Sequence, residues 1–403
     1  MLKKDILLIA NYWHFEEEKA SSRYRSFADI LCKEYDLEVV TSTFCHLKKS
    51  QRDEEKLKLD KLAYKMTLKH EKGYPKNICI ERIASYTQFG KNVLKYLESR
   101  KKPDLIIVSV PSLAVADYVT KFAKENGIPV IVDIQDLWPE AFKMALDIPV
   151  VSDVLFFPMK KQAERIYRNA SEIMAVSDTY VNVGKKQNPD CEGLSIYIGT
   201  DSELVKEKTA GITVEKPQNE FWIGYCGALG HSYDIKCCIS AIKMLQDKGI
   251  NNIIFKVMGD GVLKSDFEKF ANDQGVACDF TGLLEYGKMM RTLEVCNIAV
   301  NPIIGKSVSS IINKVSDYAA AGVPVVNTQN SPEYRELLEQ YNVGINVENG
   351  NVNEMAEAIL KLYNSPESIE QMRLNSYRLF EEKFDRIKTY PQLINKINEL
   401  IKD

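Results

Sequence analysis

The sequence predicts an α/β protein with two domains, each built around a buried parallel sheet. The chain has 403 residues, which is too many for one hydrophobic core. Short apolar runs alternate with segments of helical periodicity, and the runs have the length and continuous hydrophobicity of strands that are buried on both faces. The clearest predicted strands lie at residues 5–10, 104–110, 129–133, 221–225, 254–258 and 297–302.

The composition is typical of a soluble globular protein. Hydrophobic residues make up 45% and charged residues 27% of the chain, and the formal net charge of −3 gives no overall attraction to nucleic acid. The nine cysteines and four histidines are scattered, which argues against a disulfide framework or a zinc site and favours a reducing cytosol. No apolar run approaches the roughly 20 residues that span a bilayer, and we expect the N-terminal stretch to be a first strand rather than a secretion signal.

Residues 296–328, CNIAVNPIIGKSVSSIINKVSDYAAAGVPVVNT, predict a β-loop-α-turn-β unit. An apolar strand ends at Pro302, a polar loop follows, and an alanine-rich helix ends at Gly322. The loop meets a helix N-terminus, where unpaired backbone N–H groups and the helix dipole favour an anion. Lys314 and Asp317 lie one turn apart and therefore face the same way. A cation for a diphosphate and a carboxylate for a ribose diol would suit a nucleotide; the alternative is a chance pair on a solvated helix face.

Residues 313–325, NKVSDYAAAGVPV, resemble the donor-binding signature of family 4 glycosyltransferases, which is roughly Ser-Lys-x-x-Glu-Tyr-x-Ala-x-Gly-x-Pro-Val. Many members carry two Glu residues eight positions apart, and Ser309 and Asp317 occupy those positions here. The stretch DLWPE at 136–140 is similar to the subgroup that builds O-antigen and capsule, including N-acetylfucosaminyl and hexosaminyl transferases. The resemblance covers nearly the whole chain, and it implies the GT-B fold, in which two Rossmann-like domains with parallel sheets face each other across a cleft.

The resemblance also implies a domain organisation and an activity. We expect an acceptor-side domain at residues 1–199, a nucleotide-sugar-binding domain at 200–382, and a C-terminal helix at 383–403 that returns to the first domain. The implied enzyme is a retaining hexosyltransferase that needs neither a cofactor nor a bound metal. It would move a sugar, for which we expect an N-acetylated hexose, from a UDP-sugar to a hydroxyl of a glycan acceptor in bacterial surface polysaccharide biosynthesis. A polyprenyl-diphosphate-linked acceptor would place it in the cytoplasm, at the inner-membrane surface.

Two other classes of protein stay open. A GT-B sugar-nucleotide 2-epimerase would share the architecture, although the sequence lacks the paired acids and His that we would expect of one. A non-catalytic subunit that assists a partner glycosyltransferase is the second alternative, because an Arg and the first Glu of the family pattern are missing.

The donor site is expected in the second domain. Glycines would let the backbone approach the diphosphate closely, in a turn where family members often have an Arg; the nearest positions here are Ala228 and His231. Lys314, together with Lys306, would neutralise the leaving diphosphate, and Asp317 would hold the ribose hydroxyls. The full set of expected nucleotide-sugar contacts is Gly227, Ala228, His231, Gly259, Gly261, Gly282, Leu283, Lys306, Ser307, Ser309, Ser310, Lys314 and Asp317.

Candidate acceptor-side and catalytic residues lie at strand ends of the first domain. Arg23 and Arg25 fall in the first turn of a helix, where cations oppose the dipole and hint at an anionic ligand, although two solvated arginines would look the same. Asp136 would orient the acceptor hydroxyl or take its proton. The ring of Trp138 would face a sugar or a lipid, unless it belongs to a structural turn in the core. His14, in the loop after the first strand, is a further catalytic candidate.

Two segments of the first domain suggest contact with a membrane. Residues 48–72 are basic with interleaved apolar residues, which is typical of an amphipathic segment on an anionic surface but also of a solvated helix. The run VLFFPM at 154–159, followed by two lysines, suggests either a second membrane-facing patch or a helix start packed in the core.

Overall fold

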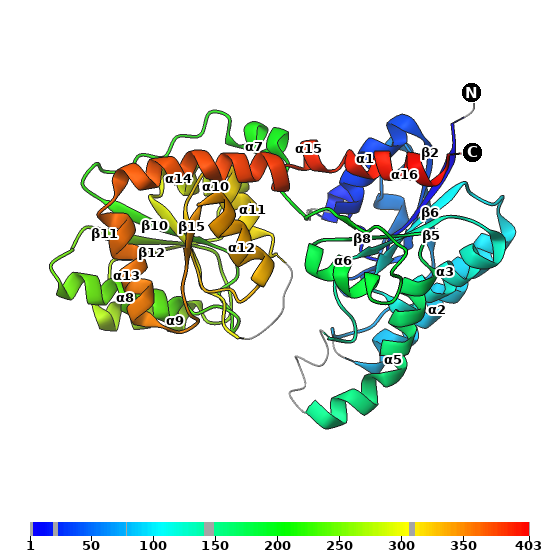
Figure 1. The fold of residues 1–403 in the computed structure, drawn as a ribbon, viewed down its shortest axis with the longest axis horizontal. Helices are drawn as coiled ribbons and strands as arrows, with labels where there is room; N and C mark the ends of the chain where they lie inside the picture. The colour runs from blue at the N-terminus through cyan, green and yellow to red at the C-terminus, as the bar shows by residue number, and fades with distance from the viewer. Residues whose placement is uncertain (1–2, 19–22, 78, 141–148, 306–310, 403) are drawn as a thin grey trace. The chain divides into compact units, whose positions relative to one another are not determined.

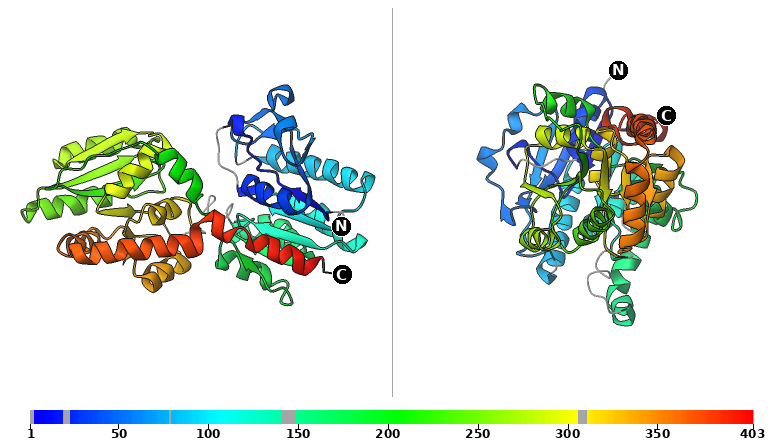
Figure 2. Two further views of the ribbon diagram at one scale, coloured as in Figure 1. Left: turned by 90° about the horizontal axis from the view of Figure 1, so that it is seen from above. Right: turned by 90° about the vertical axis from the view of Figure 1, so that its left-hand side faces the viewer.

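The computed structural model describes residues 3–18, 23–77, 79–140, 149–305 and 311–402, and the chain divides into two compact units. Unit 1 comprises Met1–Ile196 and Tyr390–Asp403, and unit 2 comprises Tyr197–Thr389. Unit 2 is therefore one continuous stretch of chain, whereas unit 1 is assembled from two stretches (Figures 1 and 2).

Unit 1 is built around a parallel sheet with the strand order β5-β2-β1-β6-β7-β8-β9. Its central strands are buried on both faces, as β6 shows, because all of its residues, LIIVSV, are buried. This is the reason that continuous apolar runs predicted these strands. The strands are β1 (Asp5–Ile9), β2 (Asp36–Ser42), β5 (Lys65–Lys69), β6 (Leu105–Val110), β7 (Val130–Ile134), β8 (Glu172–Ala175) and β9 (Leu194–Ser195).

Helices cover both faces of this sheet (Figure 1). Helices α2, α3 and α5 pack side by side on one face, and α1 and α16 lie together on the other. Ser112 caps α3, and Gly127 ends it in the left-handed conformation. The α-helices are α1 (Arg23–Glu34), α2 (Ile80–Ser99), α3 (Leu113–Asn126), α5 (Pro149–Asn169), α6 (Asp178–Lys185) and α16 (Gln392–Leu400); the short elements are η1 (Glu16–Glu18), β3 (Phe44–Cys45), β4 (Ser50–Gln51), η2 (Glu54–Lys56) and η3 (Leu59–Lys61).

Unit 2 has a second parallel sheet, with the strand order β12-β11-β10-β13-β14-β15. Side chains alternate along β10, so that Ile223 and Tyr225 belong to the core on one face and Cys226 to the core on the other. The strands are β10 (Phe221–Cys226), β11 (Ile253–Met258), β12 (Cys278–Gly282), β13 (Ile298–Asn301), β14 (Val325–Asn327) and β15 (Gly344–Asn346).

The two faces of the unit 2 sheet carry different helices. Residues of α8, α9 and α13 pack with one core, and residues of α10, α11 and α12 pack with the other (Figure 1). The helices are α7 (Ser202–Thr209), α8 (Ile235–Asp247), α9 (Lys264–Gln274), α10 (Tyr286–Val295), α11 (Lys314–Ala320), α12 (Pro332–Tyr341), α13 (Val352–Tyr363), α14 (Pro366–Leu379) and α15 (Arg386–Thr389), with the π-helical turn η4 (Phe380–Phe384) between the last two.

The alternative of a solvated helix at residues 48–72 is wrong. This segment contains β4, two short 3₁₀ turns and β5, which pairs with β2 at the edge of the sheet. Its interleaved residues Leu57, Leu62, Met66 and Leu68 pack against the unit 1 core, and Tyr64 is buried in it. The lysines are therefore the part of this segment that is left to contact an anionic surface.

The run at 154–159 lies within α5 and does not begin it, since α5 starts at Pro149. Phe156 is 9% exposed, whereas Leu155 and Phe157 are 62% and 54% exposed. The expected helix start is therefore wrong, and of these three side chains only Phe156 packs in the core as expected. Every helix in the described ranges is too short or too polar to cross a membrane.

Candidate functional site

The predicted β-loop-α-turn-β unit is present in unit 2 as β13, α11 and β14. In the sheet, β13 lies on one side of β10 and β11 lies on the other. The chain thus reverses its progress across the sheet between β10 and β13. In open α/β sheets, ligands bind beyond the carboxyl ends of the strands at such a reversal.

A cavity of about 520 Å³ lies at this position, and we call it the unit 2 cavity. Its volume is in the range of small-molecule sites. Of the predicted nucleotide contacts, Gly227, Ala228, Lys314 and Asp317 line it. The complete lining is Ile198, Cys226, Gly227, Ala228, Tyr233, Met289, Ile311, Ile312, Asn313, Lys314 and Asp317.

Lys314, the first residue of α11, carries the main positive charge of the cavity. Its side chain is 9% exposed, and its Nζ has no hydrogen-bond partner among the described residues. The ammonium lies 3.9 Å from the ring centroid of Tyr233 and 4.1 Å from that of Tyr225. These rings attract the cation through their faces but supply no counter-charge. Burial lowers the pKa of Lys314 to about 8, because the charged ammonium is less well solvated here than in water. A bound anion would stabilise the charged form.

Gly227 makes room for the Lys314 side chain. Its φ of 136° is rare for residues with a side chain, and a Cβ at this position would lie 2.7 Å from Lys314 Nζ. Gly259 and Gly261 support the turn at residues 227–229 from outside the cavity. A Cβ on Gly259 would lie 1.8 Å from Gly227 O, and a Cβ on Gly261 would lie 2.3 Å from Leu229 O. Neither lines the cavity, and both allow the turn that shapes it to pack closely.

Asp317 lies one turn along α11 and is held by two hydroxyl groups. Its Oδ1 accepts hydrogen bonds from Thr200 Oγ1 and from Tyr286 Oη, each at 2.8 Å. Burial raises the pKa of this carboxyl, although both hydroxyls and the charge of Arg386 oppose the rise. The described residues offer no hydrogen bond to Oδ2, which leaves that oxygen for a ligand in the cavity.

The sequence analysis missed Thr200, Tyr225, Tyr233 and Tyr286. Thr200 and Tyr286 both lie far from Asp317 in the sequence, and no local pattern around either showed that they contact it. Neighbouring Asp201 has a different role, since its carboxylate caps α7 by accepting from the backbone N–H groups of the next turn.

Three further predicted donor residues, His231, Gly282 and Leu283, lie apart from the cavity lining. His231 is exposed, Gly282 ends β12 with a φ of 71°, and Leu283 is 82% exposed. Lys306, Ser307, Ser309 and Ser310 lie outside the described residues.

In unit 1, the structure corrects the alternative of two solvated arginines at the start of α1. Arg23 is 4% exposed, and its Nη2 lies 3.0 Å from Oδ1 of the fully buried Asp133. Its Nη1 donates to the carbonyl oxygen of Ile196. Arg25, by contrast, is partly exposed and lies 3.4 Å from Glu16. The Arg23 guanidinium thus stabilises the fold of unit 1. To bind an acceptor as predicted, it would have to do so while it keeps its contacts with Asp133 and Ile196.

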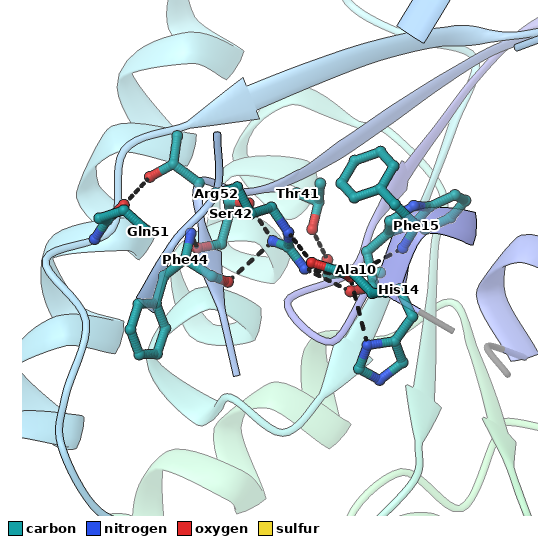
Figure 3. A network of polar contacts seen from close by, with 11 residues as sticks. Ala10, His14, Phe15, Thr41, Ser42, Phe44, Gln51 and Arg52 are labelled. Carbon is teal, nitrogen blue, oxygen red and sulfur yellow. Dashed lines mark hydrogen bonds and ion pairs between the residues drawn. The ribbon is translucent and has the colours of Figure 1, made fainter. Parts of the chain in front are cut away.

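The loop that carries His14 is held by Arg52, as Figure 3 shows. The Arg52 guanidinium donates to Glu18 Oε1 at 2.9 Å, and to the carbonyl oxygens of Phe44 at 2.9 Å and Trp13 at 2.7 Å. Burial alone would raise the pKa of Glu18, but His14 and Arg52 together hold it well below its usual range. His14 Nδ1 lies 3.8 Å from Glu18 Oε2, an ion-pair contact rather than a hydrogen bond.

Asp136 and Trp138 follow β7 and contact each other. Trp138 Nε1 donates to Asp136 Oδ2 at 3.3 Å, and burial raises the pKa of Asp136. The Trp138 side chain is 5% exposed, with Arg82 4.8 Å over its ring and the Tyr86 ring 5.8 Å away. This burial favours the alternative in which Trp138 belongs to the core over that of an open platform for a sugar or a lipid.

Comparisons with known proteins agree with this architecture. Residues 220–365 match the family described as glycosyl transferases group 1. WcaI of Escherichia coli (strain K12), whose name describes a glycosyl transferase of colanic acid biosynthesis, is 24% identical over 260 residues. That match covers 60% of this chain and 62% of WcaI, so the chain spans about three fifths of the length of this curated relative.

Two of the solved structures that resemble this protein cover nearly its whole length. Alr3699/HepE from Anabaena, crystallised with UDP, has a TM-score of 0.67 at 14% identity and covers 98% of this chain and 100% of its own. Sucrose-phosphate synthase from Thermosynechococcus elongatus has a TM-score of 0.68 at 13% identity and covers 99% of each chain. At these identities the likeness shows the fold, and the fold is GT-B, as the sequence predicted.

Proposed function

We propose that this chain is a retaining glycosyltransferase of the family 4 type that takes its sugar from a UDP-sugar. The observation that carries the proposal is the buried Lys314 ammonium, which faces the unit 2 cavity without a hydrogen-bond partner among the described residues. A diphosphate would supply the missing counter-charge and accept its hydrogen bonds. The group 1 match over residues 220–365 and the UDP bound by HepE support the same donor class.

The proposed donor contacts follow from the two charged groups on α11. Lys314 binds the diphosphate and stabilises the negative charge that grows on it as the glycosidic bond breaks. Oδ2 of Asp317 accepts hydrogen bonds from the ribose hydroxyls, while Thr200 and Tyr286 hold Oδ1. The turn at Gly227 and Ala228 brings the backbone close to the diphosphate.

The proposed chemistry retains the anomeric configuration and uses no bound metal. The acceptor hydroxyl attacks on the face from which UDP departs, and the departing phosphate takes the acceptor proton. Asp136 and His14 are the protein groups that we propose to orient the acceptor hydroxyl, and unit 1 is proposed to hold the acceptor. Arg23, Arg25 and Trp138 are the proposed acceptor-side residues. The burial of Arg23 and Trp138 counts against direct contact between these two side chains and the acceptor.

The proposed acceptor is a glycan, linked to a polyprenyl diphosphate, in the synthesis of a bacterial surface polysaccharide. An N-acetylated hexose is the proposed sugar, as in the O-antigen and capsule enzymes that the DLWPE stretch resembles. WcaI, named for colanic acid biosynthesis, supports the pathway class. Such an acceptor requires the protein to work in the cytoplasm at the inner membrane, and the lysines of residues 48–72 are the proposed membrane contact.

The first test is a metal-free calorimetric titration of the full chain with UDP, GDP, TDP and ADP. We expect micromolar binding of UDP, and we expect Asp317→Ala to abolish the preference for it. In Lys314→Ala, transfer should fall by about 10²-fold or more, the scale of losing a transition-state charge contact. Lys288→Ala, which removes an exposed lysine of α10, is the control and should leave both quantities unchanged.

The same titration separates the alternatives. Absence of binding to all four nucleotides would reject the donor assignment and favour a non-catalytic subunit. Binding of UDP together with conversion of a UDP-N-acetylhexosamine to its 2-epimer, without any acceptor, would favour the epimerase. Wild-type turnover in Lys314→Ala would reject the role of Lys314.

A further inference from the structure

A second group of cations lies in unit 1, at the carboxyl edge of its sheet. Tyr12 follows β1 and Tyr74 follows β5, while His46 and Lys49 lie between β3 and β4, the short hairpin that comes after β2. Arg82 lies in the first turn of α2, which packs beside α3. The carboxyl ends of parallel strands are the edge where α/β proteins bind ligands. We call these five residues, together with Tyr86 of α2, the unit 1 cation cluster.

Arg82 is the centre of this cluster. Its Nη2 donates to Tyr12 Oη and its Nε to Tyr86 Oη, each at 2.7 Å. Its guanidinium also lies 4.8 Å from the ring centroid of Trp138 and 5.5 Å from that of Tyr74. The two phenol oxygens fix the orientation of the guanidinium, and the faces of the aromatic rings attract its positive charge.

Lys49 brings a second cation to the same rings. Its Nζ lies 3.2 Å from His46 Nδ1 and 5.0 Å from the ring centroid of Tyr74, whose hydroxyl is 2.9 Å from that of Tyr86. Within the described part of the chain, no carboxylate lies within ion-pair distance of the Lys49 ammonium. Lys49 also has a φ of 53°, a left-handed conformation that a lysine seldom adopts, and such conformations concentrate at functional sites.

The titration behaviour of the cluster agrees with an excess of positive charge. Burial, followed by the charges of Lys49 and Arg82, lowers the pKa of His46 to about 4. Burial and the charge of Arg82 lower the pKa of Lys49. Two buried acids lie in the same region, and each already accepts a hydrogen bond: Glu71 from Ser85 Oγ at 2.8 Å and Asp136 from Trp138 Nε1 at 3.3 Å.

A buried amide adjoins the cluster in sequence. Asn11, the residue before Tyr12, is 4% exposed, and neither its Nδ2 nor its Oδ1 has a hydrogen-bond partner among the described residues. Buried side-chain amides are nearly always hydrogen-bonded to protein, water or a bound group, so Asn11 offers a donor and an acceptor at this strand end.

We propose that the unit 1 cation cluster binds an anionic group of the acceptor, either a phosphate or a sugar carboxylate. The inference rests on the proposed function, because the acceptor role of the bound molecule comes from there. Lys49 and Arg82 supply the charge, the tyrosine hydroxyls supply hydrogen bonds, and the aromatic rings exclude water. The residues of this cluster all belong to unit 1, whereas the proposed donor contacts belong to unit 2.

The test uses the full chain in a Lys314→Ala background, so that anion binding at the unit 2 cavity is weakened. Inorganic pyrophosphate, sodium glucuronate and neutral glucose are titrated at constant ionic strength, with tryptophan fluorescence as the signal because Trp138 lies beneath Arg82. We expect one or both anions to bind and glucose not to bind. Pyrophosphate alone would identify a phosphate-bearing acceptor, and glucuronate alone an acidic sugar.

Two neighbouring lysines give the matched variants. Lys49→Gln should weaken anion binding by about tenfold, the loss of one charge-assisted contact. Lys48→Gln removes an exposed lysine of the proposed membrane contact and should leave the affinity for these soluble anions unchanged. Lys49→Arg, which keeps the charge, should retain binding, and anion binding should raise the pKa of His46 in an NMR titration.

The proposal is overturned if neither anion binds, or if Lys48→Gln and Lys49→Gln weaken binding equally. Its failure is distinct from failure of the proposed function. A protein that binds these anions but no nucleotide would keep the unit 1 cluster and reject the UDP-sugar donor.

Discussion

Two arginines of unit 1, Arg23 and Arg52, and Lys314 of unit 2 differ in how their charges are paired. In unit 1, Arg23 lies 3.0 Å from Asp133 and Arg52 lies 2.9 Å from Glu18. In unit 2, Lys314 faces two tyrosine rings and has no hydrogen-bond partner within the described ranges. A buried charge without a counter-charge is costly, so it persists where function requires it. The paired arginines hold the fold, and the unpaired lysine marks the place where a ligand supplies the missing charge.

The largest expected effect is on stability, at the paired cation. Arg23→Ala should lower the free energy of unfolding by about 3–5 kcal/mol, because it leaves Asp133 buried without its partner. Urea unfolding followed by circular dichroism measures this. Arg25→Ala is the matched control in the same helix turn and should cost at most about 0.5 kcal/mol, since its ion pair is exposed. Equal losses in the two variants would break the comparison.

The next effect concerns the space around the unpaired cation. Gly227→Ala should weaken UDP binding by about tenfold, because its Cβ would press on the Lys314 ammonium and its φ is unfavourable for alanine. Gly230→Ala lies three residues along the same turn and meets no atom within 4 Å, so it should bind UDP normally. Calorimetry gives both affinities. Wild-type affinity for UDP in Gly227→Ala would contradict the proposal that a glycine is needed here to leave room for Lys314.

The pH dependence of binding sharpens the comparison. In the free protein, Lys314 has a pKa of about 8, so it is largely protonated at pH 7 and largely neutral at pH 9. UDP affinity should therefore fall by about tenfold more in the wild type than in Lys314→Ala over this interval.

The same group makes a prediction for the stability of the ligand-free protein. Because the pKa of Lys314 in the folded protein lies below the ordinary lysine value of 10.5, the unfolded chain binds more protons between pH 8 and 10.5. The free energy of unfolding should therefore rise with pH in that window, relative to Lys314→Ala. Parallel curves for the two proteins would contradict a buried, charged Lys314.

The smallest effect concerns the hydroxyls behind Asp317. Tyr286→Phe should weaken UDP binding about fivefold, by removing one hydrogen bond to a charged acceptor. The same variant should bind 2′,3′-dideoxy-UDP as well as the wild type does, because that ligand makes no ribose contact with Asp317. Tyr363→Phe, which loses a hydrogen bond to Asn252 elsewhere in unit 2, is the control. Equal weakening for both ligands would indicate a structural role.

Much of the fold could be predicted because its strands are buried on both faces. The predicted strands at 104–110 and 297–302 correspond to β6 and β13, whose apolar runs are continuous. The facing of Lys314 and Asp317 into one cavity could also be predicted, since residues three apart on a helix share a face.

What could not be predicted depends on contacts between distant residues. Thr200 and Asp317 are 117 positions apart, and no local pattern in the sequence brings them together. The alternative of a solvated helix in residues 48–72 failed for a similar reason. There, β5 pairs with β2, and Met66 and Leu68, which alternate along β5, pack against the unit 1 core. The spacing of the lysines alone gives no indication of this pairing.

The division of unit 1 into two stretches of chain affects how the protein is made. Tyr390, Leu393 and Ile397 pack into the same core as Phe27 of α1, yet they leave the ribosome only after all of unit 2. The nascent unit 1 must therefore wait with that surface open while unit 2 is synthesised and folds. An engineered chain in which residues 390–402 are joined ahead of β1 would present the whole of this core before unit 2 emerges.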